Sequence, residues 1–147
     1  MAAAIARVAR LQDLDGILAV DEAFRADGTP EWSLMSRTVF ETLISAEMVQ
    51  VSVVDDEVIG YLAWSILWGF AFIDYIRMRA DHRNRGFGSE LLRATESFVG
   101  ERGYPMLWSS TQDARALRWH ERNGFQRVGT TQWIWGNLPE TWLMKGL

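Results

Sequence analysis

A short polar segment of this sequence has the residue types and the spacing of an anion-binding turn. It comes after an apolar stretch that ends at Arg79, it precedes a helical pattern, and it reads Arg83-Asn84-Arg85-Gly86-Phe87-Gly88. Its backbone N–H groups would lack partners at the positive end of the helix dipole. Gly86 and Gly88 would let a phosphate approach the backbone with no Cβ in the way, and a guanidinium can hold phosphate oxygens with two hydrogen bonds. The segment therefore predicts a phosphate-binding turn.

Two common phosphate-binding motifs do not fit this segment. A dinucleotide-binding fingerprint needs a third glycine where the chain has Leu91, and a P-loop needs Gly-Lys-Ser/Thr, which is absent. A helix-capping loop with solvated arginines remains the alternative when the segment is taken alone. The ligand must therefore be identified from the rest of the chain.

Length and composition indicate one globular domain over residues 1–147. Apolar residues make up 48% of the chain and charged residues 23%, so the chain can bury a core. The formal net charge of −4 argues against a surface that binds duplex nucleic acid through many phosphates. The same charge is compatible with a cationic small molecule.

Missing residue types exclude several kinds of site. With no cysteine, the chain has no disulfide, thiolate zinc site or cysteine nucleophile, and two histidines are too few for an all-histidine metal site. No metal is therefore expected. The N-terminus lacks the pattern of a signal peptide, and the longest charge-free run, residues 58–73, is shorter than a membrane helix. The expectation is a cytoplasmic protein that does not bind a membrane.

The hydrophobic pattern predicts an α/β fold with a mixed, mostly antiparallel sheet of about seven strands and about four helices. Asp13 and Asp113 are expected to cap the first and last helices. The fourth and fifth strands can run parallel because a helix connects them. Strands are expected at 5–8, 49–54, 58–68, 70–79, 106–111, around 126–135 and at 141–144, and helices at about 14–24, 39–44, 89–99 and 114–122.

Three stretches together resemble the GNAT superfamily of acetyl-CoA-dependent N-acetyltransferases. They are Arg83-x-x-Gly86-x-Gly88 with the following Ser89-Glu90-Leu91-Leu92, then Ala116 with Trp119-His120-Glu121-Arg122-Asn123-Gly124-Phe125, and the closing Trp142-Leu143-Met144-Lys145. The resemblance implies a sheet that splays between its fourth and fifth strands, with the pantetheine arm of acetyl-CoA in the gap. The pyrophosphate would be held by residues 83–88, and the backbone of Met78 would bind the arm. Pairing of two subunits is a further expectation from the family.

Acetyl transfer to an amine needs a group that removes a proton from the ammonium. Asp74 is the candidate, since alternation along the fourth strand places it on the same face as Met78. Its position also resembles that of an acidic residue near the substrate amine in polyamine-type relatives. An aspartate that binds a neighbouring backbone group or an arginine is the alternative.

The departing thiolate needs a proton, and His120 stands where the family usually has a tyrosine. Positions 113, 116, 117 and 120 share a helical face, so His120 is expected to point inward and to act as the acid. The alternatives are a packed histidine bonded to a carbonyl, and protonation by water. Asp113 stands where the family commonly has an asparagine that contacts the cofactor arm.

The predicted function is direct transfer of acetyl from acetyl-CoA to a primary amine of a small molecule or amino-acid-like acceptor. The lack of cysteine favours direct transfer over a covalent enzyme intermediate. Trp32 or Trp133 is offered as the lining of an acceptor pocket. The alternatives are a protein acetyltransferase that acts on lysine or an N-terminus, and a non-catalytic acyl-CoA-binding sensor.

Overall fold

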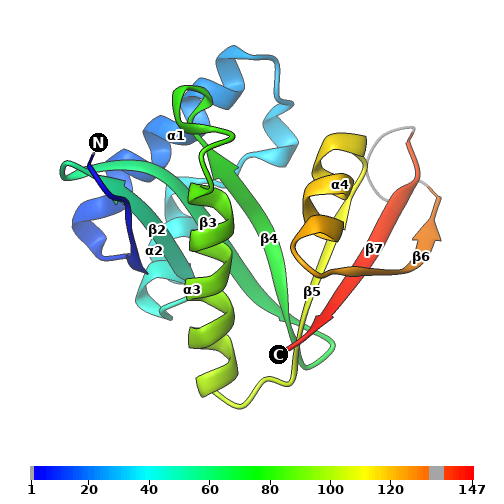
Figure 1. Cartoon of the computed structure of the whole chain (residues 1–147). Helices are drawn as coiled ribbons and strands as arrows, with labels where there is room; N and C mark the ends of the chain where they lie inside the picture. Colours follow the sequence, from blue (N-terminus) through cyan, green and yellow to red (C-terminus); the bar gives the residue numbers. More distant parts are fainter. Residues whose placement is uncertain (1, 133–137) are drawn as a thin grey trace. The chain divides into compact units, whose positions relative to one another are not determined.

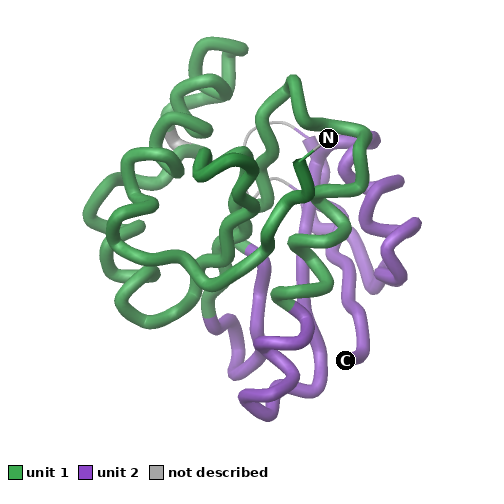
Figure 2. The backbone as a smooth tube through the Cα atoms, turned by 60° about the vertical axis from the view of Figure 1, so that its left-hand side comes forward, with its two compact units in different colours: residues 1–65, 74–95 green, residues 66–73, 96–147 purple. Residues whose placement is uncertain are grey.

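The computed structural model describes residues 2–132 and 138–147, and the chain divides into two compact units. The first unit comprises Met1–Ser65 and Asp74–Thr95, and the second comprises Ile66–Ile73 and Glu96–Leu147 (Figure 2). In the described residues seven strands form one sheet, in the order β1-β2-β3-β4-β5-β7-β6. The predicted fold class is therefore confirmed.

The elements follow the predicted order (Figure 1). The strands are β1 Ile5–Val8, β2 Val49–Val54, β3 Glu57–Leu67, β4 Phe70–Met78, β5 Met106–Thr111, β6 Gln126–Thr131 and β7 Glu140–Gly146. The helices are α1 Leu14–Ala26, α2 Arg37–Ser45, α3 Phe87–Glu101 and α4 Ala114–Arg122, with short 3-10 turns η1 Leu11–Asp13, η2 Glu31–Ser33 and η3 Ala80–His82. The strand expected to reach residue 135 ends at Thr131, and residues 133–137 lie outside the described part. None of the helices in the described ranges is both long and apolar enough to cross a membrane.

Two tight turns explain why the charge-free run folds as strands. Trp68 (φ 53°) and Gly69 (φ 82°) connect β3 to β4, and Asp55 (φ 48°) and Asp56 (φ 64°) connect β2 to β3. Two successive residues with positive φ are typical of the hairpin turn that matches the twist of its strands. The expected antiparallel arrangement of β2 and β3 is confirmed by pairs such as Val51↔Tyr61.

The first unit has its core between α1, α2 and strands β2 and β3. Ile17, Val20 and Phe40 are fully buried, and the Phe40 ring meets the Tyr61 ring edge-on at 5.3 Å. The helix α1 begins after Asp13 as predicted, but the Asp13 side chain does not cap it. Instead this carboxylate pairs with Arg7 (2.7 Å) and accepts the backbone N–H of Arg10, so it tightens the turn before the helix.

Gly60 in β3 allows a very close approach of β4. A Cβ at this position would lie 2.7 Å from Met78 Sδ and 2.8 Å from the backbone carbonyl oxygen of Arg77. Neither neighbour leaves room for a side chain, and the carbonyl belongs to a paired strand that cannot easily shift. The absence of a side chain at Gly60 therefore sets the packing at the carboxyl end of β4.

The second unit contains the predicted parallel pair. Ala71↔Leu107 and Phe72↔Trp108 join β4 to β5, and β5, β7 and β6 continue as antiparallel strands beside α4 (Figure 1). Asp113 caps α4 as predicted, since its carboxylate accepts the N–H of Arg115 at 3.0 Å. Trp68 is 76% exposed and its ring stacks on that of Trp142 at 6.3 Å.

Candidate active site

The loop between η3 and α3 has the backbone geometry of an anion-binding turn. Asn84 (φ 59°) and Gly86 (φ 84°) both take the left-handed conformation, which asparagine and glycine adopt most readily. Such a backbone turns successive N–H groups toward a common concave side. A Cβ at Gly86 would meet nothing within 4 Å, so the loop requires glycine for its conformation and leaves open space above it.

The amides of this loop have no partner within the described chain. The first hydrogen bond of α3 runs from Glu90 N to Gly86 O at 3.0 Å, and no acceptor among the described residues takes the N–H groups of residues 84–89. Free N–H groups at the start of a 15-residue helix carry the positive end of its dipole. The arrangement can hold an anion with several backbone hydrogen bonds.

Arg83 is already fixed by two contacts. Its Nε donates to the carbonyl oxygen of Met78 at 3.0 Å, and its Cζ lies 4.9 Å from the centre of the Phe24 ring. Arg85, by contrast, is exposed and makes no ion pair with a described residue. The Met78 carbonyl, expected to bind the pantetheine arm, thus accepts one hydrogen bond from within the protein and retains its second lone pair.

Asp74 is a half-buried carboxylate with an unusual acidity. Its Oδ1 accepts a hydrogen bond from Ser65 Oγ at 2.9 Å. Burial raises the pKa of Asp74 to about 6, and the hydrogen bond from Ser65 opposes that shift. Burial alternates along β4 from Phe70 to Asp74 and departs from alternation at Tyr75.

A buried charge network lies further along β4, and the sequence analysis did not find it. Arg77, 8% exposed, donates to Asp21 Oδ1 (3.1 Å), to the Tyr61 hydroxyl (3.3 Å) and to the Ser33 carbonyl (2.8 Å). The Tyr61 hydroxyl donates to the same oxygen of Asp21, and burial raises the pKa of Tyr61 well above its ordinary value. The signals in the sequence are an arginine within the mostly apolar strand β4 and an aspartate that follows Val20, but they do not reveal that the two residues meet.

His120 is 4% exposed and both of its ring nitrogens are engaged. Nδ1 lies 2.6 Å from the carbonyl oxygen of Ala116, and Nε2 lies 2.7 Å from Ser109 Oγ. Burial lowers the pKa of His120, and the bond to Ala116 opposes the shift. The ring also packs edge-on against Trp119 and Phe125. These contacts favour the alternative of a packed histidine bonded to a carbonyl.

The remaining candidates are divided between the two units. Asp74, Met78 and residues 83–88 belong to the first unit, and Asp113 and His120 to the second.

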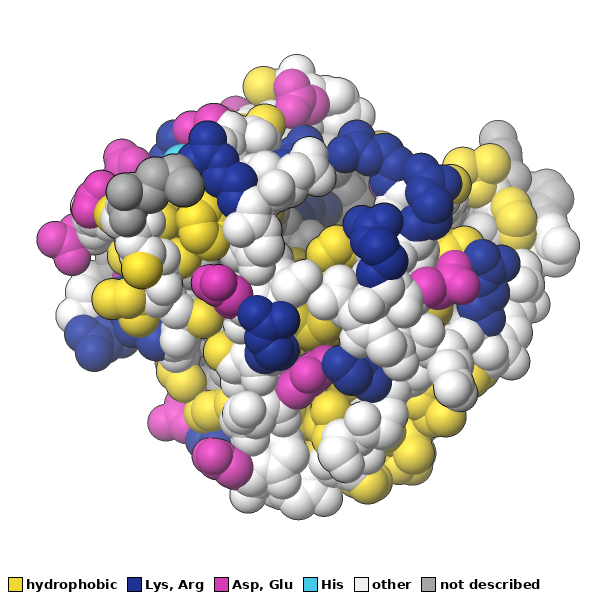
Figure 3. Space-filling model, viewed as in Figure 1, with side chains coloured by type: hydrophobic (Ala, Val, Ile, Leu, Met, Phe, Trp, Pro, Cys, Tyr) yellow, Lys and Arg dark blue, Asp and Glu magenta, His cyan; other side chains and the backbone are white. Residues whose placement is uncertain are grey.

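Basic side chains gather over α4 in Figure 3, where Arg115, Arg118 and Arg122 are exposed. Trp133 lies outside the described residues, and for Trp32 only the backbone, in η2, is described.

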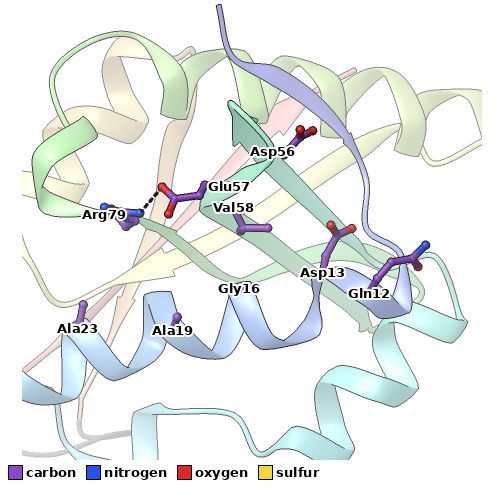
Figure 4. Close-up of a pocket in the computed structure, with 9 residues that line it drawn as sticks. All are labelled: Gln12, Asp13, Gly16, Ala19, Ala23, Asp56, Glu57, Val58 and Arg79. Carbon is purple, nitrogen blue, oxygen red and sulfur yellow. Dashed lines mark hydrogen bonds and ion pairs between the residues drawn. The ribbon is translucent and has the colours of Figure 1, made fainter. Parts of the chain in front are cut away.

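A hollow in the first unit contains none of the predicted site residues. Small residues of α1 form one wall, the segment Asp56–Val58 forms another, and Arg79 closes it through an ion pair with Glu57 at 3.2 Å (Figure 4). No group of acidic or histidine side chains within the described residues is arranged to hold a metal ion. The loop before α3 is the candidate ligand site of this unit.

Comparison with known proteins identifies the family. The family model described as "Acetyltransferase (GNAT) family" matches residues 17–125. An acetyltransferase of Agrobacterium fabrum is 28% identical over 91 residues, which are 62% of this chain and 66% of that protein, so the match spans just under two thirds of the relative's length.

Solved structures share the fold over the whole chain. A GNAT-family acetyltransferase of Bacillus cereus superposes with a TM-score of 0.83 at 20% identity and covers 98% of this chain and 97% of its own. The PaiA N-acetyltransferase of Thermoplasma acidophilum, solved with coenzyme A, has a TM-score of 0.82 at 16% identity and covers 99% of each chain. The chain belongs to the GNAT acetyltransferase family, and the resemblance seen in the sequence is confirmed.

Proposed function

We propose that this chain transfers acetyl from acetyl-CoA directly to a primary amine of a small molecule or amino-acid-like acceptor. The observation that carries the proposal is the row of unpartnered amides from Asn84 to Ser89 at the start of α3. Residues 84–86 are exposed and residues 87–89 are half-buried, and a bound diphosphate would supply acceptors for their free N–H groups. Membership of the family, and coenzyme A in the Thermoplasma acidophilum structure, support this choice of cofactor.

The residues of the loop fit a diphosphate in charge as well as in shape. Arg83 and Arg85 bring two positive charges to the free amides, and the open space at Gly86 admits an oxygen close to the backbone. The backbone of Met78 would bind the pantetheine arm, and Asp113 is a further candidate for cofactor binding. When bound, acetyl-CoA supplies the activated acetyl thioester.

Asp74 is proposed to accept the proton of the substrate ammonium. A carboxylate with a pKa of about 6 is ionised for the most part at neutral pH, and it is a stronger base than an ordinary aspartate. Ser65 holds one of its oxygens and leaves the other for the substrate. In this way Asp74 attracts the cation, and then leaves the nitrogen lone pair free for attack.

His120 is proposed to hold α4 against β5 and not to protonate the thiolate. The oxygen of Ala116 only accepts hydrogen bonds, so Nδ1 carries the proton, and Nε2 accepts the hydrogen of Ser109. In this neutral ring the only N–H proton is on Nδ1, where it is bonded to Ala116, and Nε2 has no proton to donate to the thiolate. Solvent is then the source of the proton for the thiolate.

Binding and turnover test the proposal separately. Calorimetry should show acetyl-CoA binding to the wild-type chain, and Arg83→Ala and Gly86→Val should each weaken it at least tenfold, because one removes a charge and the other strains a positive φ. A panel of small amines, lysine peptides and free N-terminal peptides, followed by CoA release, then identifies the acceptor. Binding without turnover on any amine would instead support the acyl-CoA sensor, and the absence of binding would reject the cofactor site.

A further inference from the structure

One aromatic ring of α1 contacts two guanidinium groups. The Phe24 ring centre lies 4.9 Å from Cζ of Arg83 in the loop and 5.3 Å from Cζ of Arg77 in β4. Phe24 is half-buried and packs against the core of the first unit. Arginine is attracted to the face of an aromatic ring within about 6 Å, and the attraction grows where water is excluded.

The inner of the two arginines is held rigidly. Arg77 donates to Asp21 and Ser33, and its Cζ lies 4.3 Å from the Tyr75 ring as well. Asp21 balances its charge at 3.1 Å, so a second cation can approach Phe24 without a full unpaired charge beside it. The ring therefore rests on a fixed support.

The outer arginine gains its orientation from this ring. The guanidinium of Arg83 lies over the face of the Phe24 ring, and its Nε donates to the Met78 carbonyl. Together these contacts fix the orientation of the guanidinium. These contacts use one of the five N–H donors of a guanidinium, and the four on its terminal nitrogens remain for other acceptors. A free arginine side chain loses about 2 kcal/mol of rotamer entropy when it is immobilised, and prior orientation reduces that loss on binding.

We propose that Phe24 is a positioning residue for the diphosphate site, because it orients Arg83 before the cofactor binds. The inference rests on the proposed function, since it assigns a role to a residue outside the loop in holding the same ligand. Phe24 touches no ligand itself and acts through the guanidinium. The effect is specific to ligands that carry a diphosphate.

The first test compares two ligands on matched variants. Phe24→Leu should weaken coenzyme A binding about fivefold, as loss of a partly buried cation–π contact implies. It should leave unchanged the affinity for S-acetylpantetheine, which has the thioester arm and no diphosphate. Phe24→Tyr keeps the ring face and should bind coenzyme A like the wild type. Phe98→Leu is the matched control, because the ring of Phe98, near the end of α3, also lies against a guanidinium: its centre is 3.4 Å from Cζ of Arg102.

The second test is a double-mutant cycle with Arg83→Ala. Phe24→Leu should add nothing to the loss caused by Arg83→Ala if Phe24 acts through that arginine. Equal weakening of both ligands, or additive losses in the cycle, would overturn the inference and leave the proposed function intact. If the wild type does not bind coenzyme A, the proposed function is rejected. If the wild type binds coenzyme A and Arg83→Ala binds it equally well, only the inference about Phe24 is rejected. Thermal unfolding of each variant shows that the folded protein is being measured.

Discussion

Ser109 Oγ lies 2.7 Å from Nε2 of His120, and this hydrogen bond connects the inner side of β5 to α4. The carbonyl oxygen of Ala116 can only accept, so Nδ1 carries a proton. Burial lowers the pKa of His120 and so favours the neutral ring. A charged ring would have to donate to Ser109 from Nε2, and the Ser109 hydroxyl would have to turn its hydrogen elsewhere in a buried place. The neutral form is thus the one that the fold stabilises.

His120 should therefore govern acid stability more than turnover. Its pKa is lowered in the folded state, so its contribution is present above the unfolded value near 6.5 and is lost as pH falls through the folded value. His120→Ala should lower the free energy of unfolding by about 2–4 kcal/mol at pH 8 and flatten its fall below about pH 6.5. Denaturant titrations of the wild type and the variant at several pH values measure the free energy of unfolding. A large loss of kcat per folded molecule in His120→Ala would restore the role of proton donor.

Asp74→Asn should stabilise the protein and impair it. The folded pKa of about 6 lies above the unfolded value of 3.8, so the stability that this group contributes is complete below 3.8 and is lost as pH rises through 6. The variant should gain about 3 kcal/mol at pH 8, and the gain should vanish below about pH 4. Its kcat/KM should fall at least a hundredfold, while that of the wild type declines below about pH 6. Unchanged activity would show that Asp74 has only a packing role beside Ser65. Ser65→Ala tests the hydrogen bond between the two side chains independently.

Asp21 and Arg77 should depend on each other for stability. Asp21→Asn leaves a guanidinium that is 8% exposed without its counterion, and it should cost about 3–5 kcal/mol. The double variant Asp21→Leu/Arg77→Met should cost less than the two single losses together, because it leaves no unpaired charge. Urea unfolding of the wild type, Asp21→Leu, Arg77→Met and the double variant gives the coupling energy. Strictly additive costs would mean that the two side chains do not compensate each other.

Asp113→Ala separates a cap from a cofactor contact. Loss of the hydrogen bond to Arg115 N should reduce stability by about 1 kcal/mol whatever else Asp113 does. Asp113→Asn keeps an oxygen for the cap and removes the charge. If Asp113 also meets the cofactor arm, both variants change the dissociation constant of coenzyme A, as calorimetry would show, and if it is a cap alone, neither does.

Local chemistry accounts for what the sequence predicted well. The loop at 83–88, the cap at Asp113 and the turn at Gly69 each depend on residues within a few positions of one another. The parallel arrangement of β4 and β5 followed from the helix that connects them. For Asp13 the residue type was right for a cap, but Arg7 offered its carboxylate a stronger, charged partner.

Contacts between distant positions account for what the sequence could not predict. Arg77 and Asp21 are 56 positions apart, and no spacing rule joins a strand residue to a helix residue at that distance. The state of His120 depended on Ser109, a residue with no motif of its own. The pKa of Asp74 depended on its burial and on Ser65, a residue of another strand.

Gly60 has a consequence for anyone who maps this protein by exhaustive substitution. Every replacement there must displace a thioether and a carbonyl from an adjacent strand, so every replacement should abolish function. The position would then score like an essential catalytic one although it offers no functional group. Judged by its sensitivity to substitution alone, Gly60 would be mistaken for a catalytic residue, although only the tight packing between two strands forbids a side chain there.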